Sequence, residues 1–217
     1  MSDKSNNVKW VEEQIRVWQW QKDMLQPVAE IGHFPTGLPE FYKAQLSFLA
    51  EEAGHELAGA ILAGDRTDMA DALADSLFTA LGLLNVIGCP CANVKAPSFE
   101  HISEMSTIQI ILEKLDTAVL PQDVLNYVSD LVSCLESLSA VENIPLKECF
   151  DEVCRSNDTK FWTTEQVNES KDLPEYDGWS MTRTTYNGWV VKDPNGKVKK
   201  PKTFSPPDFS KIVSVNH

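Results

Sequence analysis

Basic residues are scarce in this sequence. Its 217 residues include 19 Lys and Arg against 32 Asp and Glu, which gives a net charge of −13 at pH 7. A general nucleic-acid binder needs a basic face that neutralises phosphates, so this balance argues against that class. A single nucleotide is not excluded, because metal ions and a few local lysines can hold its phosphates. We therefore expect no nucleic-acid partner.

Cysteines are also few, and their spacing does not suit a metal. Of the five, Cys89 and Cys91 are separated by one residue, and Cys149 and Cys154 lack the spacing of zinc ligands. An odd number of cysteines without a secretory signal segment indicates reduced thiols, so we expect a cytoplasmic protein. We find no apolar run long enough to span a membrane and expect no membrane partner.

The stretch that organises the chain lies at residues 49–84 and predicts two helices folded back on each other. Apolar residues recur at helical spacing in both halves, namely Leu49, Ala53, Leu57, Ala60 and Ile61, then Met69, Leu73, Leu77, Leu81 and Leu84. Between them Gly64 suits the end of one helix, and Asp65 or Thr67 can cap the start of the next. We therefore predict a tight turn at residues 63–65.

Five acids of this predicted hairpin fall on two helix faces. Glu52 and Glu56 are four residues apart, and Asp68, Asp71 and Asp75 continue at spacings of three and four. A short turn lets the two faces meet, which costs about 4 kcal/mol for a pair of like charges 4 Å apart at an effective dielectric of 20. A hard divalent cation such as Mg²⁺ or Mn²⁺ takes oxygen ligands and removes this repulsion.

A solvated acidic face is the alternative interpretation of these spacings. Two features favour a metal site. Arg66 is the only Lys or Arg between Glu51 and Asp75, so no ladder of ion pairs compensates the acids, and Asp71 and Asp75 lie in an otherwise apolar run. We therefore predict that the five acids are metal ligands, and that Glu52 or Glu51 is the base that activates a water.

Tryptophans gather in a predicted first helix, from Val8 to about Leu25. Val11, Ile15 and Trp18 share one stripe of this helix, and Trp20 points elsewhere. Aromatic stripes are more often core or subunit contacts, and that alternative stays open. The functional hypothesis is that Trp18 or Trp20 stacks on a nucleobase.

Two amides and one loop are further candidates for contact with a ligand. Gln45 lies near the acid-bearing side of the second helix, and Asn85 lies three turns beyond the last acid, where it can read a base edge or cap the helix end. The loop at residues 27–39, rich in Pro and Gly, holds His33 and Phe34, which can border a ligand.

The remaining pattern predicts a mainly α-helical bundle with a small C-terminal β-hairpin. Helices are expected at residues 98–117 and 121–138, as scaffold and interface, and again from residue 144. After Trp162 the helical period is lost, and residues 188–198 predict a hairpin that turns at 193–196. We therefore divide the chain into a helical domain at 1–162 and an extension at 163–217. Lys197, Lys199, Lys200 and Lys202 form its basic cluster.

The motifs EEAGHEL and GDRTDMADALADSLF resemble the MazG-like branch of the all-α nucleoside triphosphate pyrophosphohydrolases. That family carries EExxE on one helix and ExxD on the next. The match departs from the pattern at Ala53, where the second acid is expected, and at Asp68, which replaces a Glu. Alternatively, Glu52 and His55 fill the first pair, so the assignment of individual ligands stays open.

A second match lies in the C-terminal third. Residues 153–160 read VCRSNDTK and resemble the VxRSNMSK segment of phage-type members, in which Asn157 and Lys160 fall where the family places an amide and an ammonium near the phosphates. The tail around residues 195–209 resembles DGKVxKPxxYxPPDL. The resemblance covers roughly residues 40–90 and 144–213, and residues 163–187 look like an insertion.

The resemblance implies an enzyme that converts a nucleoside triphosphate to a monophosphate and pyrophosphate with two or three Mg²⁺ or Mn²⁺ ions, as a homo-oligomer (dimer or tetramer). Family members differ in base, and the tryptophan-rich first helix leads us to expect a purine, chiefly (d)GTP. A phage origin would imply a nucleotide-pool role in the host cytoplasm. The alternatives are a dUTP, dCTP or phosphoribosyl-ATP pyrophosphohydrolase, and a non-enzymatic acidic helical interaction module.

Overall fold

The computed structural model describes residues 10–33, 35–91, 104–185 and 187–214. Within these ranges the chain is mainly helical with one small sheet, which confirms the predicted fold class. The elements in order are α1 (Val11–Asp23), α2 (Tyr42–Leu49), η1 (Ala50–Glu56), α3 (Leu57–Ala63), α4 (Arg66–Val86), α5 (Glu104–Thr117), α6 (Pro121–Val141), α7 (Leu146–Asp158), α8 (Thr164–Ser170), η2 (Pro174–Tyr176), β1 (Ser180–Arg183), β2 (Trp189–Lys192) and α9 (Ser210–Val213).

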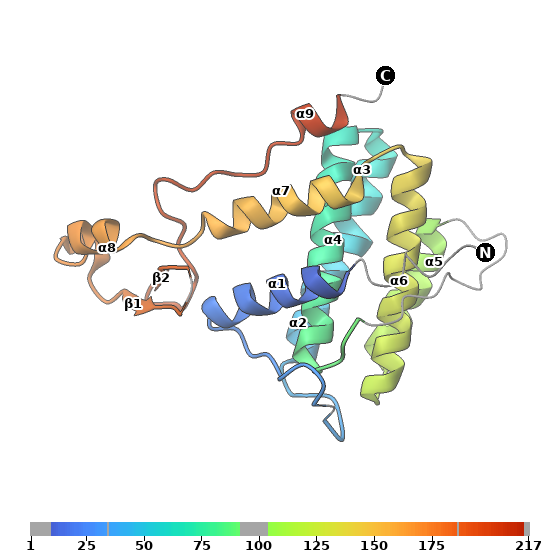
Figure 1. Cartoon of the computed structure of the whole chain (residues 1–217), viewed down its shortest axis with the longest axis horizontal. Coiled ribbons are helices and arrows are strands. Elements are labelled where there is room, and N and C mark those ends of the chain that lie inside the picture. The colour runs from blue at the N-terminus through green and yellow to red at the C-terminus, as the bar shows by residue number, and fades with distance from the viewer. Residues whose placement is uncertain (1–9, 34, 92–103, 186, 215–217) are drawn as a thin grey trace.

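Helix α4 is the centre of the bundle. It packs against α1, α2, η1, α3, α6, α7 and α9, as Figure 1 shows, so most of its circumference is covered. The apolar residues predicted for it are all buried, and four of them, Leu73, Leu77, Leu81 and Leu84, are completely inaccessible. A helix that is apolar on nearly every side requires this surround of other helices, because each exposed face would keep hydrophobic surface in water.

The helical hairpin forms as its sequence predicts. Gly64 ends α3 with a backbone φ of +68°, a left-handed conformation that glycine adopts without a Cβ clash. The Asp65 side chain then accepts hydrogen bonds from the backbone N–H groups of Thr67 and Asp68, at 2.9 and 3.1 Å. The turn is therefore fixed by local chemistry, and it returns α4 antiparallel to the acid-bearing segment.

That acid-bearing segment, η1, is a π-helix and not a continuous α-helix. π-helical turns are rare and frequently mark functional sites. The apolar spacing of its sequence fits an α-helix equally well, so the sequence pattern did not indicate the wider turn. Ala53 is completely buried against the bundle, whereas Glu51, His55 and Glu56 are exposed.

Helix α1 buries a different face from the predicted one. The predicted apolar stripe of Val11, Ile15 and Trp18 is wrong, since Ile15 is 43% exposed and the other two are only half-buried. The buried face instead carries Gln14 and Gln21, with Val17 between them. These amides find hydrogen-bond partners on α4 and in the segment behind it, which removes the cost of burying them.

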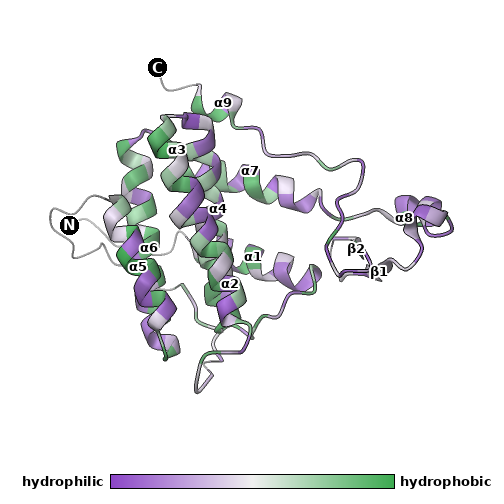
Figure 2. Ribbon diagram, turned by 180° about the vertical axis from the view of Figure 1, so that it is seen from behind, coloured by the Kyte–Doolittle hydropathy of each residue, from purple (hydrophilic) through white to green (hydrophobic). Residues whose placement is uncertain are grey.

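The C-terminal extension lies to one side of the bundle. In Figure 1 helix α8 and the sheet project beyond the ends of α1 and α7, and Figure 2 shows α8 as mostly hydrophilic. Strand β2 lies where a strand was expected, and residue 196 ends a turn as predicted, with Gly196 N–H donating to the Asp193 carbonyl. The expected partner strand was wrong: β2 pairs antiparallel with β1, and residues 192 and 198 form only an isolated bridge.

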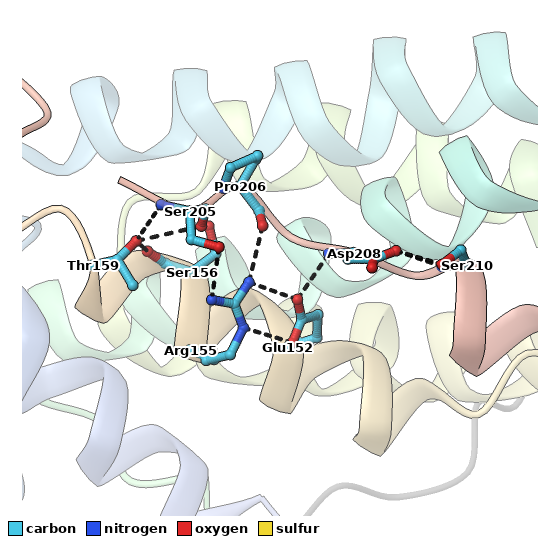
Figure 3. A network of polar contacts seen from close by, with 8 residues as sticks. All are labelled: Glu152, Arg155, Ser156, Thr159, Ser205, Pro206, Asp208 and Ser210. Atoms are coloured by element: carbon cyan, nitrogen blue, oxygen red, sulfur yellow. Dashed lines mark hydrogen bonds and ion pairs between the residues drawn. The ribbon is translucent and has the colours of Figure 1, made fainter. Parts of the chain in front are cut away.

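The last ordered segment returns to the bundle along α7. Figure 3 shows Arg155 at its centre, with a bidentate ion pair to Glu152 that includes a distance of 2.7 Å. Arg155 also donates to the Pro206 carbonyl, and the Asp208 N–H donates to Glu152 at 2.7 Å. These charge-assisted bonds hold the chain on α7 and deliver α9 to the end of α4.

Two expectations about composition can be compared with the described residues. All five cysteines are free and buried, as core thiols. Helix α4 is long and apolar enough, by length and composition alone, to cross a membrane, so the expectation of no such run was wrong. Its most apolar window is 83% buried inside the bundle, as the central helix of a helical bundle would be.

Candidate functional site

The five predicted acids gather around two neighbouring cavities. We name the first the inner cavity: it has a volume of about 280 Å³ and is lined by Trp20, Gln21, Gln26, Gln45, Phe48, Glu52, Asp75, Phe78, Thr79, Asn157 and Lys160. The outer cavity, about 540 Å³, is lined by residues that include Glu51, His55, Glu56, Asp68 and Asp71. The structure therefore brings η1, α4 and the end of α7 together, as the two separate sequence motifs suggested.

The acids influence one another across both cavities. Burial, followed by the charges of Asp75 and Glu56, raises the pKa of Glu52 to about 8. Burial and the charge of Asp71 raise the pKa of Asp75 to about 7. The pKa of Asp71 is also raised, again by burial first and then by Glu56 and Asp68. Shifts of this kind, with both burial and like charges as causes, are concentrated at functional sites.

Two oxygens of this cluster have no partner. Glu52 Oε2 and Asp71 Oδ1 are buried and accept no hydrogen bond from the described residues. An unpaired buried carboxylate oxygen is costly, and a cation is the ligand that removes the cost. As the side chains stand, however, no three His, Cys, Asp or Glu side chains within the described ranges are arranged to hold a metal ion. The donor chemistry fits Mg²⁺ or Mn²⁺, and the number of ligands is not defined by this conformation.

Lys160 is the cation of the inner cavity. Burial lowers its pKa, with a further contribution from Lys200, while Asp75, Glu52 and Asp71 oppose the shift. It forms no ion pair with another described residue, and its ammonium lies over the Trp20 ring at 5.7 Å from the centroid. Asn157, one turn before it, is buried and also lines the cavity. Both residues lie beside the acids, where the resemblance would place them.

Aromatic side chains line the same cavity one turn away from the acids, with Phe48 four residues before Glu52 and Phe78 three residues after Asp75 on α4. Trp20 packs edge-on against Phe78 with ring centroids 5.2 Å apart, and its Nε1 donates to the Asn157 carbonyl at 3.2 Å. Phe48 is 58% exposed at the cavity wall, which is unusual for a large aromatic residue. Trp18 does not line either cavity; its Nε1 donates to the Ala29 carbonyl. Of the two candidate tryptophans, only Trp20 faces the site.

The two predicted amides have different places. Gln45 lines the inner cavity as predicted. Asn85 is completely buried and lies behind the cavity, where its Nδ2 donates to Gln21. Gln21 itself lines the cavity and was missed from the sequence. The sequence does carry a signal for Gln21. Gln14 and Gln21 are seven residues apart and therefore lie on one face of the helix, but a search for a stripe of apolar residues does not consider glutamines.

Three open points of the sequence analysis also have a place in the structure. Glu52 lines the inner cavity, and His55 lines the outer one with Glu56, Asp68 and Asp71. Glu51 lines the outer cavity, which leaves Glu52 as the candidate base beside Lys160. His33 is exposed and borders neither cavity, and Phe34 lies outside the described residues.

Comparison with known proteins gives no activity. No family model matches the chain, and no solved structure matches it. One relative, an uncharacterized protein of Acanthamoeba polyphaga mimivirus, is 23% identical over an alignment 215 positions long, and the alignment covers 81% of this chain and 84% of the relative. The argument for function therefore depends on the site.

Proposed function

We propose that the protein is a metal-dependent nucleoside triphosphate pyrophosphohydrolase, which adds water to a (d)NTP and releases a (d)NMP and pyrophosphate. One observation carries the proposal: the inner cavity is lined by carboxylates and a lysine together with aromatic rings and amides, and along its α2–η1 wall the amide, ring and acid follow in the order Gln45, Phe48 and Glu52. A nucleotide has the same division, with phosphates at one end and a flat base with hydrogen-bonding edges at the other. The resemblance of the sequence motifs points to the same reaction.

The acids are suited to hold Mg²⁺ or Mn²⁺. Glu52 and Asp75 in the inner cavity, and Glu56, Asp68 and Asp71 in the outer one, supply only oxygen ligands, which these hard cations prefer. When bound, such ions offset the charge of the triphosphate and make water more acidic. The two unpaired carboxylate oxygens support this assignment independently of the motif.

The remaining roles belong to the chain itself. The Lys160 ammonium binds the phosphates, and the Asn157 amide can donate to a phosphate oxygen from the same side. Glu52, with its raised pKa and an unpaired Oε2, is placed to take a proton from the water that attacks the α-phosphorus. The α–β anhydride bond then breaks, and pyrophosphate leaves with its electron pair.

We propose further that (d)GTP is the preferred substrate and that the protein assembles as a homo-oligomer. Trp20 and Phe78 offer ring surface to a purine, and the buried Gln21 and half-buried Gln45 offer amides to its edge. Leu62 at the end of α3 and Val141 at the end of α6 are 88% and 69% exposed, and a subunit contact would cover these apolar side chains.

A panel of dNTPs and NTPs, each with Mg²⁺ or Mn²⁺, tests the proposed reaction. The purified protein should release pyrophosphate and a monophosphate, and no orthophosphate, with dGTP or GTP among the best substrates. The two products distinguish attack at the α-phosphorus from attack at the γ-phosphorus. Release of orthophosphate alone, or of no product with any nucleotide and either metal, would contradict the proposal.

A further inference from the structure

Gly82 on α4 lies under two glutamine amides that line the inner cavity. A Cβ at this position would lie 2.9 Å from Gln21 Nε2, closer than real Cβ contacts, and 3.0 Å from Gln45 Nε2, tighter than nearly all of them. The missing side chain therefore lets α1 and α2 place both amide nitrogens on the same spot of α4. Glycine is unfavourable inside a helix, so this close approach is a reason for its presence.

The direction of the Gln21 amide is fixed by groups that can only accept hydrogen bonds. Asn85 Nδ2 donates to the Gln14 backbone carbonyl at 3.3 Å and to Gln21 Oε1 at 3.0 Å. Gln21 Nε2 donates to the Gly82 backbone carbonyl at 3.3 Å. Because a backbone carbonyl never donates, neither amide can be reversed without losing a bond. Gln21 therefore turns its nitrogen, and not its oxygen, toward Gly82 and Gln45.

The cavity consequently presents N–H donors at this spot. The second hydrogen of Gln21 Nε2 is left for a ligand or for the Gln45 carbonyl, and the Gln45 amide makes no hydrogen bond to another described residue. If Gln45 turns its oxygen to Gln21, its own NH₂ group faces the cavity. If it does not, both nitrogens face the cavity. Either arrangement requires an acceptor from the ligand.

We propose that Gln21 and Gln45, lying on Gly82, prefer bases that present a ring carbonyl oxygen, as guanine, uracil, thymine and cytosine do, over adenine. A carbonyl oxygen has two lone pairs for two converging N–H donors, whereas each ring nitrogen of adenine that accepts a hydrogen bond has one. Asn85 is a positioning residue that fixes the direction of the Gln21 amide. The inference rests on the proposed nucleotide site but adds the class of base. It also places guanine, and not adenine, as the purine that the site prefers.

Binding of products tests this selection without any turnover. Titration calorimetry with dGMP, dUMP and dAMP in Mg²⁺ should show that the better of the first two binds at least about tenfold more tightly than dAMP. In Gly82→Ala the added methyl group displaces both amides, and this preference should fall to less than about threefold. The contacts are with the ends of flexible side chains, so the variant should fold.

Stability separates this effect from a general structural defect. Gly82→Ala should melt within about 4 °C of the wild type, because the gain in helix propensity from alanine opposes the loss of the buried Gln21 hydrogen bonds to Gly82 and Asn85. Gly59→Ala is the matched control for helix stability, since no atom lies within 4 Å of its added methyl group. Lost base preference together with retained melting temperature is the signature of a specificity residue.

Gln45→Met is an independent test on a half-buried side chain. Methionine has a similar length but no N–H donor, so the preference for carbonyl-bearing bases over adenine should fall to less than about threefold. Gln19→Met makes the same change at an exposed position of α1 and should leave the preference unaltered.

The outcomes separate this inference from the proposed reaction. Base-selective binding without hydrolysis of any triphosphate would overturn the reaction and keep the inference. Three results would overturn the inference. They are hydrolysis with no preference for carbonyl-bearing bases, an equal base preference in Gly82→Ala and wild type, and no binding of any monophosphate.

Discussion

The two ends of the inner cavity differ in how well their polar groups are satisfied. At the acid end, Glu52 Oε2 and nearby Asp71 Oδ1 have no partner, and the pKa values of both carboxyl groups are raised. At the amide end, Gln21 is hydrogen-bonded through both its oxygen and its nitrogen, and the groups without a described partner are the neutral Gln45 amide and Asn85 Oδ1. The acid end therefore gains stability from a cation, whereas at the amide end the protein itself holds Gln21 in place.

This difference follows from the neighbours of one helix. The N-terminal half of α4 faces η1, which brings more carboxylates to it, and the C-terminal half faces α1, which brings glutamines. Like charges repel, but amides pair with each other and with backbone carbonyls. We therefore expect the acid end to respond to pH and to divalent cations, and the amide end to respond to neither.

Asp71→Asn should have the largest effect, because it breaks the acid end and leaves the amide end intact. The change removes a charge with little change of shape, and pyrophosphohydrolase activity should fall by at least about 100-fold, since even residues that only support metal ligands contribute 10- to 100-fold. Base preference in product binding should be retained. Steady-state kinetics of pyrophosphate release and calorimetry measure the two properties.

Asp65→Asn is the matched control for this variant. Asp65 caps the same helix from outside both cavities, and asparagine is an equally good cap. Its activity should remain within about twofold of wild type, as expected for a surface position. Normal turnover by Asp71→Asn would remove this residue from the proposed metal site.

The pH dependence of stability should sharpen the contrast between the two ends. For Asp75 the pKa rises from 3.8 in an unfolded chain to about 7 in the fold, and for Glu52 from 4.5 to about 8. Between these values the folded state binds more protons than the unfolded state, so stability present near pH 4 is lost as the pH rises to 8. In EDTA the melting temperature should therefore fall from pH 5 to pH 8.

Divalent cations should oppose this fall. Mg²⁺ or Mn²⁺ at pH 8 should raise the melting temperature by at least about 3 °C, the shift that about 1 kcal/mol produces in a chain of this size. Asp71→Asn should show a smaller rise. A melting temperature that is independent of both pH and metal would show that the acids form a solvated face, which was the alternative interpretation of their spacing.

The sequence predicted best what local chemistry decides. The turn at Gly64 and Asp65 needs only a glycine and a capping oxygen, and the buried positions of α4 need only their spacing. It failed where a tertiary partner overrides the local pattern. Gln21 is a polar residue on a buried helix face, where the sequence pattern leads one to expect apolar residues. Its burial is explained only by its hydrogen bonds to Gly82 and Asn85, which are distant in sequence.

The same reason accounts for the two other failures. Strand β1 has four residues and only one of them is even half-buried, so its alternation carries little signal until β2 pairs with it. The π-helical turn of η1 has the same apolar spacing as an α-helix, with Ala53 as its one buried residue, so the sequence pattern does not distinguish the two.

The smallest effects should come from the two tryptophans of α1, which separate the cavity from its surroundings. Trp20→Phe keeps a ring in the inner cavity but removes the bond to the Asn157 carbonyl, so KM for the preferred nucleotide should rise about threefold, a part of the 1–3 kcal/mol that stacking contributes. Trp18→Phe removes the bond to the Ala29 carbonyl outside the cavity. It should lower the melting temperature by about 2 °C or more and leave KM unaltered, because one hydrogen bond contributes about 1 kcal/mol. If both variants have the KM of wild type toward every nucleotide, α1 contributes the Gln21 amide to the cavity and its aromatic rings serve packing alone.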